Sequence, residues 1–347
     1  MSSSLGVGGA LGLPAAALLA QYTNWHVLFW VAAGLAVLVF VLVRAFVPES
    51  EVRSGGRFDL VGAAGLSAGL VCLLLAISKG ADWGWGSGTT LTLICAAVAL
   101  LLVWGWWELR TGHALVDLRV TMHRQVLLTN LSSIMLGFAM YAMSLVLPQL
   151  LQMPTATGYG LGQSMVAAGL YMGPSGLVMM AVSPLSARIT AAWGAKVSLM
   201  TGAATIAVGY ALGIVLMSEA WQMVIVGSVI GAGVGFAYGA VPALIMSAVP
   251  VSETASANGL NSLMRSIGTS VSAAVCGVVL AHMTTRFGDF ALPSRDGFRT
   301  ALIIGCAAAL GALVLAAFLP GRRPAAVPAG ADTGVDALPA STSAAKA

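Results

Sequence analysis

Ten long apolar runs limit what this sequence can fold into. They span residues 4–20, 26–46, 60–78, 89–107, 126–149, 164–184, 197–217, 222–247, 262–283 and 299–319. A bilayer core needs about 20 mostly apolar residues for each crossing helix, and the runs fit that length. Only helices and closed barrels can cross lipid, and continuous apolar runs exclude the alternating pattern of a barrel. The sequence therefore predicts an all-α polytopic membrane protein with about ten transmembrane helices.

Charged residues are too scarce for a water-soluble fold. Only 8% of the 347 residues are charged and 59% are hydrophobic, whereas soluble domains carry about 25% charged residues. The net charge of +4 comes from the loops between the runs. We interpret it as a sign of membrane topology, so the expected partner is the lipid bilayer and not a nucleic acid.

The basic residues predict how the chain is oriented. If each run crosses the membrane once, 12 of the 16 Lys and Arg residues fall on the same side. An excess of Lys and Arg marks the cytoplasmic face. We therefore expect a multi-pass protein of the cell (plasma) membrane with both termini in the cytoplasm.

Two polar linkers divide the chain into parts. Residues 1–46 contain a pair of apolar runs, residues 47–125 contain an inserted transmembrane hairpin with its charged linkers, and residues 126–320 contain a block of six runs. Residues 321–347 are rich in Ala, Pro, Ser and Thr, which is typical of disorder. We expect this last segment to be a disordered cytoplasmic tail.

The reactive residue types form no set that predicts catalysis or metal binding. All 12 Asp and Glu residues fall in loops, in the tail or at the ends of runs, so none marks a proton relay deep in the membrane. The four Cys residues lie singly within runs without a CxxC pair, and the four His residues have no ligand spacing. We therefore expect neither an enzyme nor a metal or other cofactor.

Polar residues recur on one face of two runs. The first stripe is Asn130, Ser133, Gly137, Tyr141 and Ser144, and the second is Asn258, Asn261, Arg265, Gly268 and Ser272. Such stripes line a cavity or make hydrogen bonds between helices, and both readings stay open. A charge at mid-bilayer costs about 2.5–3.5 kcal/mol, so an intramembrane charge usually faces a cavity or a partner. Arg265 lies near a predicted cytoplasmic end, where it could instead extend to the interface.

Methionines gather in the runs 126–149 and 164–184. Their flexible, polarizable side chains suit a pocket for varied apolar ligands, although they also serve as lipid-facing filler. If the chain is a transporter, the runs 126–149, 164–184, 222–247 and 262–283 would line the C-terminal half of its substrate pathway. The predicted pathway residues are Asn130, Ser133, Tyr141, Ser144, Met140, Met179, Asn261 and Arg265.

Glycines recur at four-residue spacing in three runs. Such spacing lets helix backbones touch where lipid offers no hydrophobic drive. Simple packing and sliding contacts within a transporter both fit the pattern. The predicted packing residues are Gly8, Gly12, Gly169, Gly173 with Pro174, Gly227, Gly231, Gly235 and Gly239.

Two segments resemble motifs of a known family. The run from Gly8 to Pro14 resembles the Gly/Pro antiporter motif on the fifth helix of major facilitator drug exporters, with one residue between Gly12 and Pro14. Residues 183–196 resemble the cytoplasmic loop motif of that family and contribute Arg188, Gly194 and Lys196. The acidic and basic pair usual in that motif is replaced here by alanines at positions 191 and 192.

The hairpin between charged linkers resembles the fourteen-helix drug:proton antiporter branch (DHA2-like) of the same superfamily, in which two extra helices separate two six-helix bundles. The resemblance extends to Pro320 and aligns the ten runs with helices five to fourteen. It implies a partial major facilitator fold that lacks the first four helices. Residues 1–46 would then be a remnant of the N-terminal bundle, and the family's membrane-embedded acid and arginine motif, implicated in proton coupling, would lie in the missing part.

The resemblance implies a secondary active transporter that works by alternating access around a midplane site. The expected activity is proton-coupled efflux, by antiport, of small apolar or amphipathic compounds including drugs. Its partners would be a small-molecule substrate and protons, and Gly8, Gly12 and Pro14 would pack against the other bundle and limit leak. The alternative is a non-transporting membrane scaffold or subunit, which would keep the glycine faces but need no polar stripes.

Overall fold

The structure, a computed structural model, describes residues 2–48, 59–111, 121–250, 253–287 and 290–320. Its long helices are α1 (Ser2–Tyr22), α2 (Trp25–Phe46), α3 (Leu60–Trp83), α4 (Gly88–Glu108), α6 (Arg124–Gln152), α7 (Met165–Trp193), α8 (Ala195–Val215), α9 (Ala220–Met246), α10 (Thr254–His282) and α11 (Arg295–Ala317). The predicted tail, residues 49–58 of the first charged linker and residues 112–120 of the second lie outside the described residues.

The helices agree with the apolar runs of the sequence. Nine of them, α2 to α11, are long and apolar enough to cross a membrane, and α1 adds a shorter apolar segment, Gly6–Tyr22. Polar side chains begin several helices by accepting a hydrogen bond from a first-turn amide, as Asp59 does from Gly62 and Ser294 from Gly297. The prediction of an all-α polytopic fold is confirmed.

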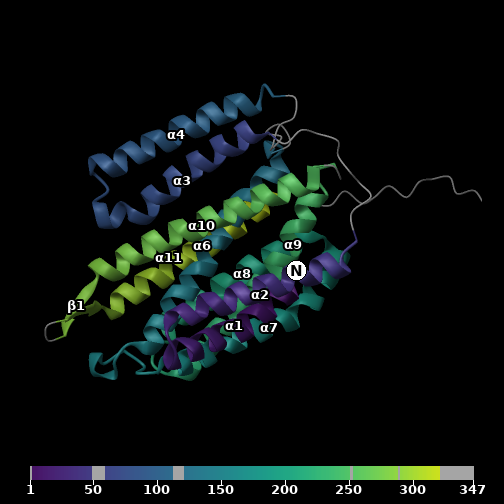
Figure 1. Ribbon diagram of the computed structural model, residues 1–347. Coiled ribbons are helices and arrows are strands. Elements are labelled where there is room, and N and C mark those ends of the chain that lie inside the picture. Colours follow the sequence, from purple (N-terminus) through teal and green to yellow (C-terminus); the bar gives the residue numbers. More distant parts are fainter. Residues whose placement is uncertain (1, 49–58, 112–120, 251–252, 288–289, 321–347) are drawn as a thin grey trace, which may run out of the picture.

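Helices α6 to α11 pack into one bundle with a continuous apolar core. In it α6 contacts α9, α10 and α11, while α9 contacts α7 and α8 (Figure 1). Tyr210 of α8 joins three of these helices: its ring is fully buried, its hydroxyl donates to the carbonyl of Ala139 on α6, and it fills the space opposite Gly305 of α11. This bundle is the scaffold that positions the candidate site.

The remaining helices lie against the outside of this bundle. Helix α1 packs along α7, and α2 contacts α1 but buries none of its own residues (Figure 1). Helices α3 and α4 form a hairpin, and α3 contacts α10. The division of the chain at residues 46, 125 and 320 stays a prediction, since these contacts alone do not define domains.

One connection contains structure that the sequence analysis did not predict. Strands β1 (Thr284–Phe287) and β2 (Phe290–Pro293) pair antiparallel between α10 and α11, with Thr284 opposite Pro293. Each strand has four residues, too few for an alternating pattern to stand out in the sequence. The carbonyl of Pro293 accepts a hydrogen bond from Tyr159, which follows the short 3-10 helix η1 (Thr155–Thr157). The hairpin is thereby joined to the connection between α6 and α7.

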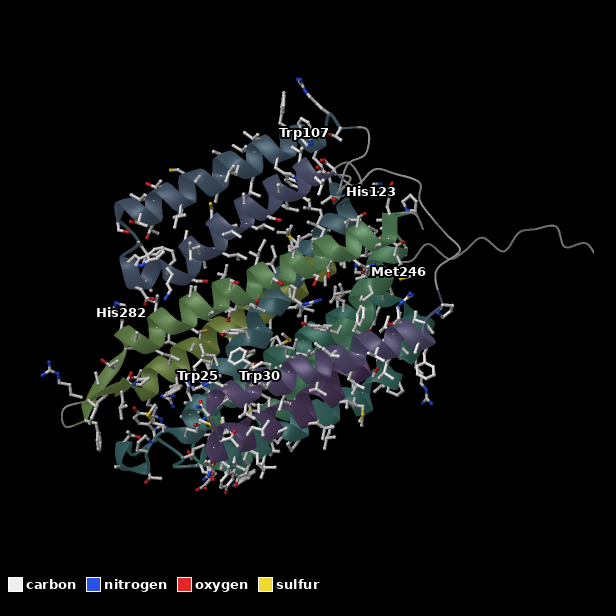
Figure 2. All side chains as sticks on the ribbon, viewed as in Figure 1. Trp25, Trp30, Trp107, His123, Met246 and His282 are labelled. Atoms are coloured by element: carbon white, nitrogen blue, oxygen red, sulfur yellow. The ribbon has the colours of Figure 1, made fainter. Side chains whose placement is uncertain are left out.

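The connections alternate between the two ends of the molecule. Trp107, His123 and Met246 lie toward one end, whereas Trp25 and His282 lie toward the other, where β1 and β2 are found (Figures 1 and 2). This alternation is what successive membrane crossings require, because each helix must return the chain to the opposite face.

Candidate functional site

Three buried polar side chains connect α6 and α10. The amide nitrogen of Asn261 lies 2.9 Å from the side-chain oxygen of Asn130 and 2.8 Å from the hydroxyl oxygen of Ser133, and it donates to both. Each of the three residues is at most 3% exposed. In a medium with few competing partners, such bonds favour one relative placement of two helices.

Glycines let the backbones of α6 and α10 approach closely beside this cluster. A Cβ atom placed on Gly137 would lie 2.4 Å from the carbonyl oxygen of Arg265, and one on Gly268 would lie 2.0 Å from that of Ile134. Both distances are far shorter than a van der Waals contact, so these positions accept no side chain at the observed separation. The polar stripes of the two helices therefore meet because glycine stands at the crossing.

A first cavity of about 310 Å³ opens beside the cluster, between α6, α9 and α10. It extends toward the end of the molecule where Met246 lies (Figure 2). Helix α10 supplies most of its polar groups, while α9 supplies much of the apolar wall. The lining residues are Ser133, Leu136, Tyr238, Val241, Pro242, Met246, Asn258, Asn261, Ser262 and Arg265.

A second cavity of about 300 Å³ lies between α1 and the bundle. Its wall is rich in methionine and glycine, with two serine hydroxyls. The lining residues are Gly9, Leu13, Met140, Met143, Ser144, Ser175, Gly176, Met179, Gly231, Val234, Tyr238 and Arg265. Tyr238 and Arg265 line both cavities, and we call this shared border the junction.

Arg265 and Tyr238 contact each other at this junction. The guanidinium carbon of Arg265 lies 5.0 Å from the ring centroid of Tyr238, within the range of a cation–π contact. One guanidinium nitrogen donates to the hydroxyl of Ser262 at 3.2 Å, and the Tyr238 hydroxyl donates to the sulfur of Met140 at 3.1 Å. The described residues lining the two cavities include no Asp or Glu. The junction thus carries a positive charge that its walls leave unbalanced.

The structure brings most of the predicted pathway residues together. Ser133, Asn261 and Arg265 line the first cavity, and Met140, Ser144, Met179 and Arg265 line the second. Asn130 lies behind the first cavity, where it accepts the hydrogen bond from Asn261. Tyr141 is half-buried and lines neither of these two cavities.

Sequence reasoning missed Tyr238, although it borders both cavities. The available signal was a hydroxyl-bearing aromatic residue within the small and apolar residues of 231–242. Ser262 was also missed, because it lies beside the polar stripe of α10 and not on it. Its hydroxyl accepts from Arg265, so the direction of the arginine side chain brings it into the site.

One face of α9 packs on α7 through the predicted glycines. A Cβ atom on Gly231 would lie 2.4 Å from the carbonyl oxygen of Ser175, and one on Gly235 would lie 3.0 Å from a carbonyl oxygen of α7. Gly227 has more room, since its nearest neighbour would be 3.6 Å away. Gly239 is half-buried.

Helix α7 packs on α1 through a second glycine face. A Cβ atom on Gly176 would lie 2.3 Å from the amide nitrogen of Ala10, and one on Gly169 would lie 3.2 Å from a backbone carbonyl of α1. Gly173 would be 3.4 Å from the carbonyl of Ala10, and the neighbouring Pro174 is half-buried. Backbone atoms of the two helices are therefore in direct contact.

The face of α1 that makes this contact differs from the predicted one. Gly8 and Gly12 are exposed, and nothing lies within 4 Å of a Cβ atom placed on either. Gly6, Ala10 and Pro14 face α7 instead. The reason is helical geometry: positions 6, 10 and 14 form one line at four-residue spacing, and positions 8 and 12 lie about 200° around the helix from it.

The residues of the predicted cytoplasmic loop motif lie at the junction of α7 and α8. Gly194 ends α7 with φ +91°, a conformation that favours glycine. Lys196 donates to the carbonyls of Ala317 at 2.8 Å and Leu319 at 2.7 Å, so its ammonium caps the end of α11. Arg188 is exposed on α7. Of these three residues, Lys196 connects two helices of the bundle.

Comparison with known proteins identifies the family. Residues 1–273 match the sequence model described as Major Facilitator Superfamily. The chain is 28% identical over 276 residues to Multidrug resistance protein Stp of Mycobacterium tuberculosis, covering 79% of this chain and 50% of that protein. It is 28% identical over 342 residues to the Tetracenomycin C resistance and export protein of Streptomyces glaucescens, covering 93% of this chain and 60% of that protein.

Two further similarities are weaker. A Probable actinorhodin transporter of Streptomyces coelicolor is 25% identical over 291 residues, which cover 80% of this chain and 49% of that protein. A crystal structure of a mutant of the nucleoside transporter NupG covers 92% of this chain and 82% of its own at 16% identity, with a TM-score of 0.49. At that score it adds nothing to the family assignment. The chain spans about half the length of the relatives it matches.

Proposed function

The chain belongs to the Major Facilitator Superfamily, a family of multi-pass membrane transporters and not of enzymes, and from that premise we propose an export function. The chain would supply the α6–α11 side of a path by which small apolar or amphipathic compounds, drugs among them, leave the cell. The observation that supports this proposal is the pair of cavities that share Arg265 and Tyr238 in their walls. Mostly apolar walls with a few convergent polar groups are typical of small-molecule sites.

The relatives support export as the direction of transport. Two of them are named for multidrug resistance or for resistance and export, and a third is named as a transporter of actinorhodin. These names describe those proteins. We extend only the shared theme to this chain: outward transport of small molecules.

We further propose that the chain belongs to the fourteen-helix branch and that transport is coupled to protons. The α3–α4 hairpin, which lies in the sequence between the α1–α2 pair and the six helices α6 to α11, supports the branch assignment. The described residues lining the two cavities include no Asp, Glu or His. The titrating group would therefore have to come from outside these cavities.

The proposed orientation places both termini in the cytoplasm of a cell bounded by the plasma membrane. Ser87 lies in the turn between α3 and α4, at the end of the molecule opposite His123. A topology reporter fused after Ser87 should be outside the cell, and one fused after Arg119 should be cytosolic. The reverse result would contradict the orientation and, with it, the direction of transport.

The proposal is tested by binding of an apolar probe, N-phenyl-1-naphthylamine, to the purified chain in lipid nanodiscs. Binding should be saturable above the signal of empty discs. Met246→Trp, which fills the end of the first cavity, should weaken binding about ten-fold. Leu102→Trp is the control, because Leu102 is 69% exposed on α4 and lines neither cavity.

The alternative reading, a scaffold that only packs, predicts a different outcome. It expects no saturable binding, or equal binding by both tryptophan variants. Either result would show that the cavities do not bind small apolar molecules, and the proposed export function would lose its support.

A further inference from the structure

We propose that the site selects molecules that carry an anionic group on an apolar body, and that Arg265 binds the anion. This inference rests on the export function proposed above and names its substrate class. It starts from the arginine at the junction of the two cavities and from what surrounds that arginine.

The first step is the position of Arg265 in its helix. It is the twelfth residue of α10, so about 16 Å of helix separates it from the start at Thr254. Its head group lies over the ring of Tyr238 and borders both cavities. The guanidinium is therefore turned toward α9 and the cavities.

The Arg265 guanidinium has no acidic partner among the described residues. The partners of the Arg265 guanidinium are the Ser262 hydroxyl and the Tyr238 ring, and both are neutral. No Asp or Glu is among the described residues that line either cavity. On α10 itself, Glu253 precedes Arg265 by twelve positions, about 18 Å along the helix axis. A guanidinium has five N–H donors, so most of its capacity remains for a ligand.

The third step is the chemistry that would complete this site. A carboxylate or sulfonate presents two acceptor oxygens in one plane, which matches the N–H fork of an arginine. The guanidinium lies over the Tyr238 ring and donates one hydrogen bond to Ser262, so other donors remain for an anion. An anion would thus gain charge-assisted hydrogen bonds with the half-buried Arg265, whereas a cation would meet a like charge there.

The fourth step is the shape and character of the walls. Leu136, Val241 and Met246 give the first cavity an apolar side, and three methionines line the second. Volumes of about 310 and 300 Å³ suit small drug-sized bodies. Methionine adapts to different outlines because its side chain is unbranched and flexible. The site would therefore be selective for the anionic group and would accept apolar bodies of different shapes.

Three probes with one aromatic body test the inference: 9-anthracenecarboxylate, its neutral amide 9-anthracenecarboxamide and the cation of 9-(aminomethyl)anthracene. Each is titrated at pH 7 against the full chain in phosphatidylcholine nanodiscs, with empty discs subtracted. The carboxylate should bind about ten-fold more tightly than the amide, and the cation most weakly.

The variants compare the ratio of carboxylate to amide affinity, because general damage to the fold lowers both affinities together. Arg265→Gln should reduce the ratio about ten-fold, and Arg265→Lys should restore part of it. Arg110→Gln is the matched control: Arg110 lies 4.3 Å from the ring centroid of Trp106 and lines neither cavity, so the ratio should stay unchanged.

The outcomes separate this inference from the proposed function. If the three probes bind and the ratio is the same in the original chain and in Arg265→Gln, the anion preference is overturned while export stands. Tightest binding of the cation would overturn it as well. If none of the probes binds above empty discs, the cavities do not bind such ligands, and this result contradicts the proposed export function itself.

Discussion

Asn261 and Asn130 lie 131 positions apart in the sequence, yet the amide nitrogen of the first is 2.9 Å from the side-chain oxygen of the second. The same nitrogen also donates to Ser133. This contact fixes the position of α10 relative to α6 beside the first cavity, so the shape of the cavity depends on it.

Asn261→Ala should therefore destabilise the bundle. It removes both hydrogen bonds and leaves the buried oxygen of Asn130 without this donor, at a cost of about 1 kcal/mol for a polar contact between membrane helices. Urea or thermal unfolding of the purified chain measures the loss. Asn258→Ala is the control, since its amide donates to Thr254 within its own helix. Equal losses of stability in the two variants would show that the hydrogen bonds between α6 and α10 do not stabilise the bundle.

The close crossing of α6 and α10 gives a second prediction. Gly268→Ala should lower the free energy of unfolding by about 1–3 kcal/mol, because its Cβ atom would collide with the carbonyl oxygen of Ile134. Gly277→Ala on the same helix has open space and should be neutral or stabilise by up to about 1 kcal/mol. A melting curve for each variant decides the matter, and a loss in Gly277→Ala equal to that in Gly268→Ala would contradict the structure.

The contact between α1 and α7 gives a third prediction. Ala10 is 7% exposed, so a cysteine there should be protected from maleimide. Gly176→Ala should expose it, because the new methyl would lie 2.3 Å from the Ala10 amide and force the helices apart. Gly12→Ala, with nothing within 4 Å, should leave the protection unchanged. If the cysteine at position 10 reacts in the Gly12→Ala variant and not in the Gly176→Ala variant, the face of α1 that contains Gly8 and Gly12 is the one that packs on α7.

A scan with cysteines tests the first cavity directly. If the polar stripe on run 126–149 lines a cavity, the sequence predicts reaction with a water-soluble thiol reagent at positions 133, 137 and 141 and none at 135 and 142. The structure revises this: Ser262 and Ser133 line the cavity, with Ser262 more exposed, whereas Gly137 faces the backbone of α10. With the four native cysteines replaced by serine, Ser262→Cys should react fastest and Ser133→Cys more slowly. Reaction at Gly137→Cys as fast as at Ser262→Cys would place the cavity elsewhere.

The lysine that caps α11 gives a last prediction. Lys196→Met removes two hydrogen bonds to terminal carbonyls and a favourable charge at a helix end, and should cost about 1 kcal/mol of stability. Lys79→Met breaks an ion pair with Asp82 at 2.9 Å on an exposed surface, which is worth at most about 0.5 kcal/mol. Thermal unfolding at low and high salt compares them, and a larger loss from Lys79→Met would refute the capping role.

The helices could be predicted because their cause is local. Each run must be apolar along its whole length to enter lipid, and that length is visible without knowledge of its neighbours. All ten predicted runs accordingly overlap one described helix each. The polar stripes of α6 and α10 were also visible, since a three- and four-residue spacing is a property of one helix.

The packing partners could not be predicted in the same way. Gly8 and Gly12 have the same four-residue spacing as Gly6 and Ala10, so the sequence alone does not show which pair contacts another helix. The placement of α7 shows that Gly6 and Ala10 do. Tyr238 belongs to the site because α9 places its ring against Arg265 of α10. A contact between two helices cannot be predicted from the sequence of either helix alone. Periodicity describes a face, but the neighbour that covers it is set by the assembled bundle.

Helix α2 buries none of its residues and has the highest mean hydropathy among the nine long apolar helices, 2.6. Its backbone bonds are satisfied within the helix, so in oil it is stable without any protein neighbour. Lipid tails alone can therefore surround α2 on every side, and a substitution of one apolar residue for another on its surface should cost the bundle little.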